Sequence, residues 1–180
     1  MVVLATITLL RPVWLQELYV RAEEAISSGA LPFVTQAARE RESRTHGAPE
    51  QGKPIGVLEI PRLGLSSVVI EGDEAAALVL GVGHLADTPM PWTRGNSVFA
   101  AHRDTFFRPL EHIRQNDIIR FATADGDLEY RVLATKIVAS TDVDVLAPTS
   151  TSTLTLITCY PFTYIGPAPQ RFIVTAERVS

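Results

Sequence analysis

The stretch TLTLITCYPFTYIGPAPQRFIVTAER, residues 153–178, holds two apolar runs joined by a proline-rich connection. Both runs are rich in Val, Ile, Leu, Phe and Thr, which favour β-strands. Pro161 cannot extend a central strand, so the first run ends close to Cys159. If the runs pair antiparallel, the connection folds back and brings Arg171 near the Cys159 end. The stretch therefore predicts two neighbouring strands that carry a thiol and a guanidinium at one end.

Five more runs of the same kind precede this pair, and turn residues separate several of them. The expected strands are Ile55–Ile60, Ser67–Ile70, Ser97–Ala101, Ile118–Ala122, Leu128–Val138, Thr153–Thr158 and Phe172–Arg178. Residues 124–127, Ala-Asp-Gly-Asp, predict a hairpin turn. A short helix is expected at 74–80 and a helical turn at 109–113. Many short strands with few helices indicate a mainly β fold, either a closed barrel or a sandwich.

The composition narrows the classes of function. The chain has 180 residues, the size of one ordinary domain, and its 46% hydrophobic content suffices for a sizeable core. Sixteen basic and 20 acidic residues give a net charge of −4, which excludes a strongly basic nucleic-acid binder. The single cysteine excludes an internal disulfide, a CxxC pair and a four-thiolate metal site. We expect neither a metal nor a cofactor.

Three residues at predicted strand ends have the chemistry of a nucleophilic site. A lone cysteine is most often a buried small hydrophobe, but the strand-end position of Cys159 also suits a reactive thiol. A cysteine nucleophile needs a histidine to take its proton, and of the four histidines only His102 ends a strand-like run. A guanidinium at Arg171 would stabilise a developing oxyanion; the alternative is an exposed strand-end arginine.

These segments resemble the sortases, a family of cysteine transpeptidases. The resemblance rests on TLITC at 155–159 followed by Tyr-Pro-Phe, on RFIV at 171–174 and on AAHRDTFFR at 100–108. GVGH at 81–84 and GNSVFAAH at 95–102 also match, and the form TLITCYPF…APQRF is most similar to the class D branch. The match covers about residues 55–180, which we expect to be the catalytic domain.

The resemblance implies a closed eight-stranded β-barrel with short helices and an active site at the strand ends. It implies Cys159 as the nucleophile, His102 as its acid/base partner and Arg171 as the stabiliser of the substrate carbonyl or oxyanion. Thr158 and His84 match family positions near the site and are candidates for substrate binding. For Thr158 the alternative is an ordinary strand threonine, and for His84 it is a structural hydrogen bond.

The reaction implied by the resemblance has two halves. The thiol cleaves an LPxTG- or LPxTA-type sorting signal after its threonine and forms a thioacyl intermediate. An amine on a peptidoglycan precursor or on a pilin-like protein subunit then takes the acyl group. Two alternatives stay open: a Cys–His hydrolase that releases the acyl group to water, and a non-enzymatic barrel that binds peptides or cell wall. No nucleic acid is expected as a partner.

The amino-terminal part differs from the rest. Val2–Leu10 is a nine-residue apolar run, whereas a membrane-spanning helix needs roughly 17–25 residues. We expect residues 1–29 to form an apolar or amphipathic helix and residues 30–54 to form a polar linker. The helix either packs on the domain or is the remnant of a membrane anchor. The resemblance implies a membrane-associated location on the extracytoplasmic face of a bacterial cell membrane.

Overall fold

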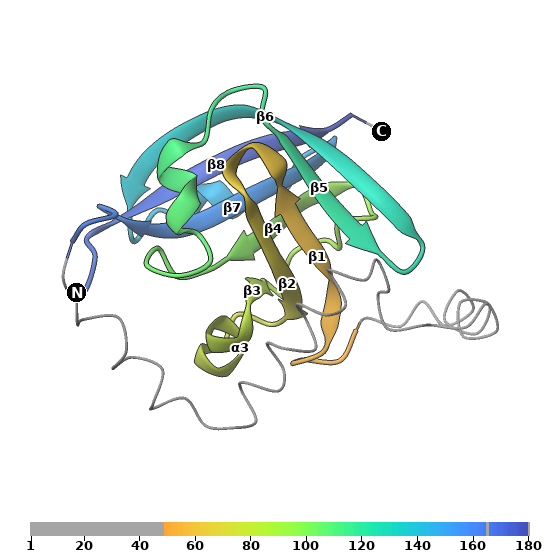
Figure 1. Cartoon of the computed structure of the whole chain (residues 1–180), viewed down its shortest axis with the longest axis horizontal. Coiled ribbons are helices and arrows are strands. Elements are labelled where there is room, and N and C mark those ends of the chain that lie inside the picture. Colours follow the sequence, from red (N-terminus) through yellow and green to blue (C-terminus); the bar gives the residue numbers. More distant parts are fainter. Residues whose placement is uncertain (1–48, 165, 180) are drawn as a thin grey trace, which may run out of the picture. The chain divides into compact units, whose positions relative to one another are not determined.

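The computed structural model describes residues 49–164 and 166–179 (Figure 1). The predictions for residues 1–29 and for most of the 30–54 linker lie outside these residues. The chain divides into two units, residues 1–46 and 47–180, and the barrel belongs to the second. Among the described residues no helix is long and apolar enough to cross a membrane.

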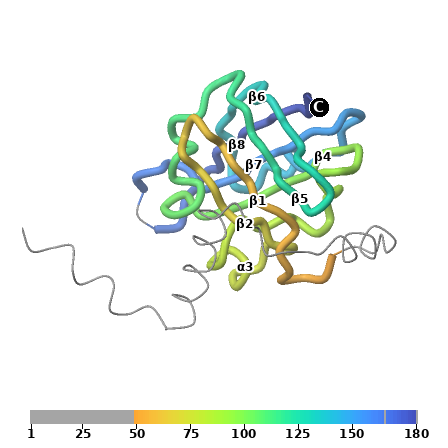
Figure 2. The backbone as a smooth tube through the Cα atoms, turned by 45° about the vertical axis from the view of Figure 1, so that its right-hand side comes forward, coloured from red at the N-terminus to blue at the C-terminus, as the bar shows by residue number. Residues whose placement is uncertain are grey.

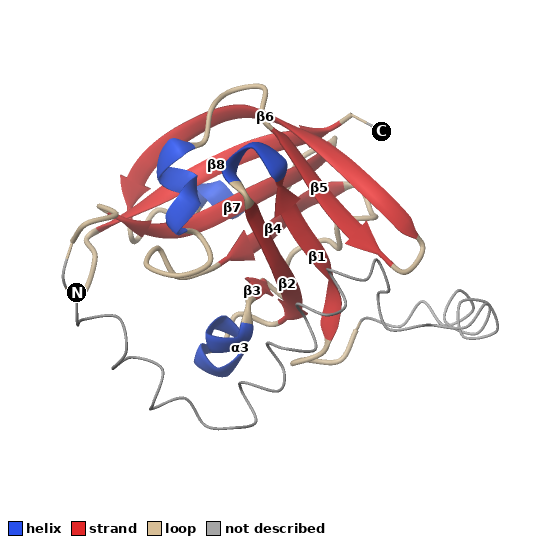
Figure 3. Ribbon diagram, viewed as in Figure 1, coloured by secondary structure: helices blue, strands red, loops and turns tan. Residues whose placement is uncertain are grey.

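Eight strands close into a barrel in the order β1-β2-β3-β4-β7-β8-β6-β5. The strands are β1 Pro54–Ile60, β2 Leu65–Glu71, β3 Val82–His84, β4 Gly95–Ala100, β5 Ile118–Thr123, β6 Gly126–Ala139, β7 Ser152–Tyr160 and β8 Gln170–Arg178. The helices are short (Figure 3): α3 Ala75–Leu80 and the 3-10 turns η2 Pro61–Leu63, η3 Arg108–His112 and η4 Asp144–Leu146. The closed eight-stranded barrel confirms the predicted fold and excludes the sandwich.

The seven predicted strands all form, and their ends differ from the expected ones by no more than two residues. Strand β3 was not predicted, because its three residues are too few to show an alternating pattern. Gly83 allows this strand to lie close to its neighbours. A Cβ there would lie 2.6 Å from the Gly72 carbonyl oxygen and 2.9 Å from Leu78 Cδ2, so a larger residue would displace the turn before α3.

The strand pairing positions the carboxyl ends of β4 and β7 together. β4 runs parallel to β7, with Ala100 opposite Ile157. β8, the last strand of the barrel, lies between β7 and β6 and is antiparallel to both (Figures 1 and 2). Alternate side chains of each strand point into the barrel. In β4, β7 and β8 the inward-pointing side chains include Phe99, Leu154, Leu156, Val174 and Ala176. The intervening residues of β4, β7 and β8 therefore share the outer face.

Candidate active site

Cys159 and Arg171 lie directly opposite each other on β7 and β8. Residues opposed in an antiparallel pair have Cβ atoms about 4.5–5.5 Å apart, on the same face of the sheet. Both residues alternate with core positions, so both point to the outer face. Cys159 is half-buried and unpaired, the penultimate residue of its strand. The predicted antiparallel fold-back from Cys159 to Arg171 is confirmed.

His102 follows the neighbouring strand on the other side of β7. Ala100 is the register partner of Ile157, and the Ala101 N–H donates to the Ile157 carbonyl oxygen at 3.2 Å. If this parallel register is continued by two residues, His102 lies level with Cys159. The two backbone segments are then about 4.8 Å apart, the usual spacing of neighbouring strands. The His102 side chain is exposed and forms no hydrogen bond with any described residue. The structure thus gathers Cys159, His102 and Arg171 at one end of β4, β7 and β8.

The Arg171 guanidinium already has two protein partners. Its Nη1 donates to the carbonyl oxygens of Ala168 at 3.1 Å and Gln170 at 2.9 Å. These are its only hydrogen bonds among the described residues, so Nη2 and Nε stay available to a ligand. The connection before β8 therefore holds this side chain by one nitrogen and leaves the others free for a developing negative charge.

Thr158 points into the barrel, with 2% of its surface exposed. Its hydroxyl donates to the Ala101 carbonyl oxygen at 2.8 Å, across to the residue that precedes His102. A side chain buried in this way presents no surface to a substrate. The threonine instead links the residue before Cys159 to the residue before His102 by a hydrogen bond, which fixes the spacing of Cys159 and His102.

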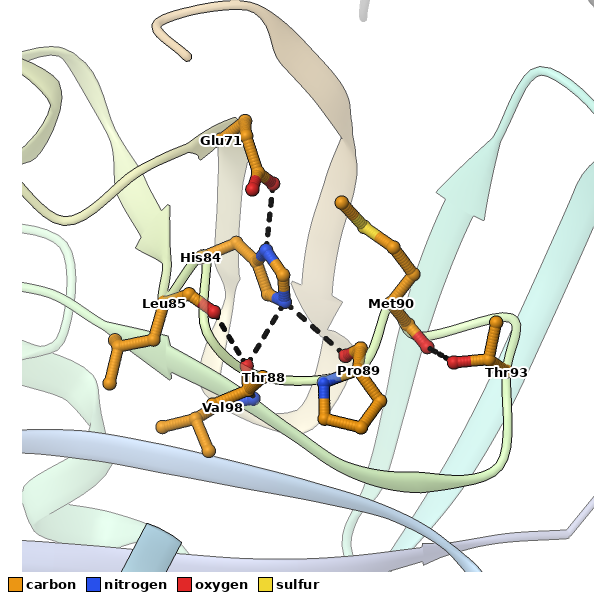
Figure 4. A network of polar contacts seen from close by, with 8 residues as sticks. All are labelled: Glu71, His84, Leu85, Thr88, Pro89, Met90, Thr93 and Val98. Carbon is orange, nitrogen blue, oxygen red and sulfur yellow. Dashed lines mark hydrogen bonds and ion pairs between the residues drawn. The ribbon is translucent and has the colours of Figure 1, made fainter. Parts of the chain in front are cut away.

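His84 is fully buried in the wall of the barrel (Figure 4). Its Nδ1 lies 2.7 Å from Glu71 Oε2, and its Nε2 lies 3.1 Å from Thr88 Oγ1 and 3.3 Å from the Pro89 carbonyl oxygen. The ring also meets Phe99 edge-on, with centroids 5.8 Å apart. Both ring nitrogens therefore have partners within the protein, as expected for the structural hydrogen bond that was the alternative for this residue.

The β6–β7 connection covers the outer face of β4 and β7 around Asn96 and Thr155. Asn96 and Thr155 point outward, yet each is only 3% exposed. Asn96 Nδ2 donates to the carbonyl oxygens of Val145 and Ala147 in the β6–β7 connection, and the Thr155 hydroxyl donates to Asn96 Oδ1 at 2.7 Å. Asn96 was not among the predicted site residues, and it lies one position before the expected strand Ser97–Ala101.

The β4–β5 connection, which contains His102, is held to the barrel by a charged contact. Both oxygens of the Asp117 carboxylate accept from Arg62, at 2.5 and 2.6 Å, and the Arg114 N–H donates to it at 2.7 Å. The hydrogen bond from Arg62 is the largest cause that lowers the pKa of Asp117. Arg62 also donates to the His112 carbonyl oxygen at 2.6 Å, so this cluster holds η3 in place.

The described residues contain no group of three or more His, Cys, Asp or Glu side chains arranged to hold a metal ion. What they do bring together, on a closed eight-stranded barrel, is a free thiol flanked by a guanidinium on one strand and an imidazole on the other. These are the residue types that a cysteine-dependent acyl-transfer site uses.

Comparison with known proteins agrees with this class. The family model described as Sortase domain matches residues 58–179. Sortase D of Bacillus subtilis is 38% identical over 133 residues, which are 73% of this chain and 67% of that protein. The chain belongs to the sortase family of cysteine transpeptidases.

Solved structures of sortases share the fold. A Clostridium perfringens Sortase D5 transpeptidase superimposes with a TM-score of 0.73 at 21% identity, over 94% of this chain and 100% of that chain. Sortase E of Streptomyces avermitilis superimposes with a TM-score of 0.61 at 31% identity, over 73% of this chain and 91% of that one. The predicted membership of the family, with similarity to class D, is confirmed.

Proposed function

We propose that this sortase cleaves an LPxTG- or LPxTA-type sorting signal after its threonine and transfers the acyl group to an amine. One observation carries the proposal: Cys159 and Arg171 are register partners on the outer face, and the parallel register of β4 and β7, continued by two residues, brings His102 level with them. This arrangement supplies a nucleophile, an acid/base group and an oxyanion donor within one side-chain length of each other.

The first half-reaction breaks the amide bond after the threonine. The Cys159 sulfur, as thiolate, attacks the threonine carbonyl carbon, and a C–S bond replaces the C–N bond. His102 in its protonated form gives a proton to the departing amine, which would otherwise be a poor leaving group. Free donors of Arg171 stabilise the oxygen of the tetrahedral intermediate, where negative charge develops.

The second half-reaction resolves the thioacyl intermediate. The acceptor amine attacks the thioester carbonyl, a C–N bond replaces the C–S bond, and the thiolate leaves. The amine gives its extra proton to the neutral imidazole of His102, which restores the starting state. A cell-wall precursor or a pilin-like subunit is the acceptor we propose, and proteins bearing the sorting signal are the donors. The proposed location is the extracytoplasmic face of the membrane.

The hydrolase alternative uses the same first step and then releases the acyl group to water. Incubation of the full chain with LPxTG and LPxTA peptides, with and without triglycine, separates the two. Intact-mass measurement of a thioacyl adduct on Cys159 and a triglycine-containing product support transfer. Cleaved peptide without that product supports hydrolysis instead.

Cys159→Ala is the matched control for this experiment. It removes only the sulfur of a half-buried side chain, so the barrel should melt at nearly the same temperature. We expect no adduct and no product with either peptide. Peptide cleavage that persists in Cys159→Ala would overturn the proposed nucleophile and with it the proposed function.

A further inference from the structure

The β7–β8 connection, residues 161–169, is held by arginine side chains in a regular way. Every second carbonyl oxygen from residue 162 to residue 170 accepts a hydrogen bond from a guanidinium nitrogen. The donors and acceptors are Arg108 Nη1 to Phe162 at 2.7 Å, Arg103 Nη2 to Tyr164 at 2.5 Å and to Gly166 at 3.2 Å, and Arg171 Nη1 to Ala168 at 3.1 Å and to Gln170 at 2.9 Å. Arg103 and Arg108 both come from the β4–β5 connection, the segment that also carries His102.

The connection forms fewer backbone hydrogen bonds than it receives from arginine side chains. Proline occupies positions 161, 167 and 169, and each proline removes one backbone donor. Among the described residues, only two backbone hydrogen bonds fix the connection, from Tyr164 N–H to the Pro161 carbonyl and from Ser140 N–H to the Pro169 carbonyl. Guanidinium donors therefore supply most of the bonds that define its course.

Arg103 makes the central contact of this set. Its Nη2 bridges the Tyr164 and Gly166 carbonyl oxygens, and its Cζ lies 5.7 Å from the centre of the Tyr164 ring, within cation–π range. Its Nη1 is buried and has no partner among the described residues. The side chain is thus committed to the connection through one nitrogen and its planar face, which a lysine cannot reproduce.

We propose that Arg103 is a positioning residue that acts through the β7–β8 connection on Arg171. Arg103 fixes the carbonyl oxygens at 164 and 166, and the next two in the series, at 168 and 170, hold Nη1 of Arg171. When the carbonyl oxygens at 164 and 166 are released, those at 168 and 170 are able to move as well. The free N–H groups of Arg171 are then no longer oriented toward the acyl group on Cys159. The catalytic consequence rests on the proposed function; the mechanical link does not.

The mechanical link is tested by hydrogen–deuterium exchange of the connection. Arg103→Ala and Arg103→Lys should both speed amide exchange in a peptide covering residues 160–170, by about tenfold or more, because the connection loses its central anchor. Arg120→Ala is the matched control, since it removes an exposed arginine paired with Glu129 on β5 and β6. Unchanged exchange in the Arg103 variants would overturn the proposal, whatever the enzyme's substrate.

The catalytic consequence is tested by the rate of thioacyl formation. Arg103→Ala should lower kcat by about tenfold to a hundredfold and change KM by less than about threefold, because the affected group acts on the transition state. In an Arg171→Lys background the same substitution should have little further effect, since the residue it positions is absent. Equal fold-losses in both backgrounds would overturn the action through Arg171. Absence of any adduct with the unsubstituted chain would instead refute the proposed function.

Discussion

His84 and His102 both follow apolar segments of the chain, and the barrel gives them opposite surroundings. His84 is fully buried, with both ring nitrogens engaged by Glu71, Thr88 and the Pro89 carbonyl. His102 is exposed, and its ring has no hydrogen-bond partner among the described residues. A histidine whose nitrogens are all committed holds structure together, whereas one with free nitrogens beside a thiol is able to move a proton. The two regions can therefore be told apart by substitution.

The largest expected effect is that of His102→Ala on turnover. Loss of the proton donor should lower kcat/KM for the sorting peptide by about 10²–10⁴-fold. The melting temperature should stay within about 1 °C, since the side chain is exposed. His112→Ala, another exposed histidine, lying in η3, is the control. A loss of less than about tenfold in His102→Ala would contradict the proposed role.

His84→Ala should have the reverse pattern. It leaves the Glu71 carboxylate buried without its partner, so the free energy of unfolding should fall by about 2 kcal/mol or more. Denaturant unfolding measures this change. The kcat of the folded fraction should stay within about threefold of the original value. A stable but inactive His84→Ala would remove the distinction between the two histidines.

A smaller effect is expected for Tyr130, whose buried hydroxyl donates to the Pro91 carbonyl at 2.7 Å. It anchors the same 85–93 segment that His84 contacts, so Tyr130→Phe should lower the free energy of unfolding by about 1 kcal/mol near pH 7. Burial raises the pKa of Tyr130 to about 12, with Arg178 opposing the rise. The ordinary value is about 10, so this stabilisation is complete below pH 10 and is lost as the pH rises toward 12.

Alkaline unfolding curves of the two proteins check this expectation. The original protein should lose stability between pH 10 and 12 more steeply than Tyr130→Phe, which has no phenol at this position. Parallel curves over that range would show that the Tyr130 hydroxyl contributes nothing through its ionisation.

The smallest effect is expected at the Asp117 carboxylate, because its partner Arg62 is 40% exposed and solvent screens the pair. Asp117→Asn should lower the melting temperature by about 2 °C near pH 7. The pKa of Asp117 is lowered, so the stabilisation is present above the unfolded value of about 3.9 and is lost as the pH falls through the folded one.

Thermal melts from pH 2 to 8 check this dependence. The difference between the original protein and Asp117→Asn should be constant above pH 5 and should close below about pH 4. Glu129→Gln, in an exposed pair with Arg120, should change the melting temperature less at every pH. A difference that grows in acid would contradict the assigned direction.

The strands and the Cys159–Arg171 pair were predictable because both depend on local patterns. Alternation marks a strand, and a short connection with turn residues between two strands favours antiparallel pairing. Strand patterns alone were compatible with a closed barrel or a sandwich, because closure depends on pairing between segments far apart in sequence, and only the resemblance to the sortases implied the closed barrel. The burial of His84 and Thr158 was not predictable for the same reason: their partners come from other strands and from the 85–93 segment. The arginine contacts to the β7–β8 connection left no periodic signal at all.

The three site residues differ in how much of the barrel must form before they meet. Cys159 and Arg171 lie 12 residues apart on consecutive antiparallel strands, whereas the Thr158–Ala101 contact beside His102 closes a loop of 57 residues. Contacts between residues that are distant in sequence form more slowly than local ones. We therefore expect Arg171 to reach Cys159 early in folding and His102 to reach it only when β4 pairs with β7.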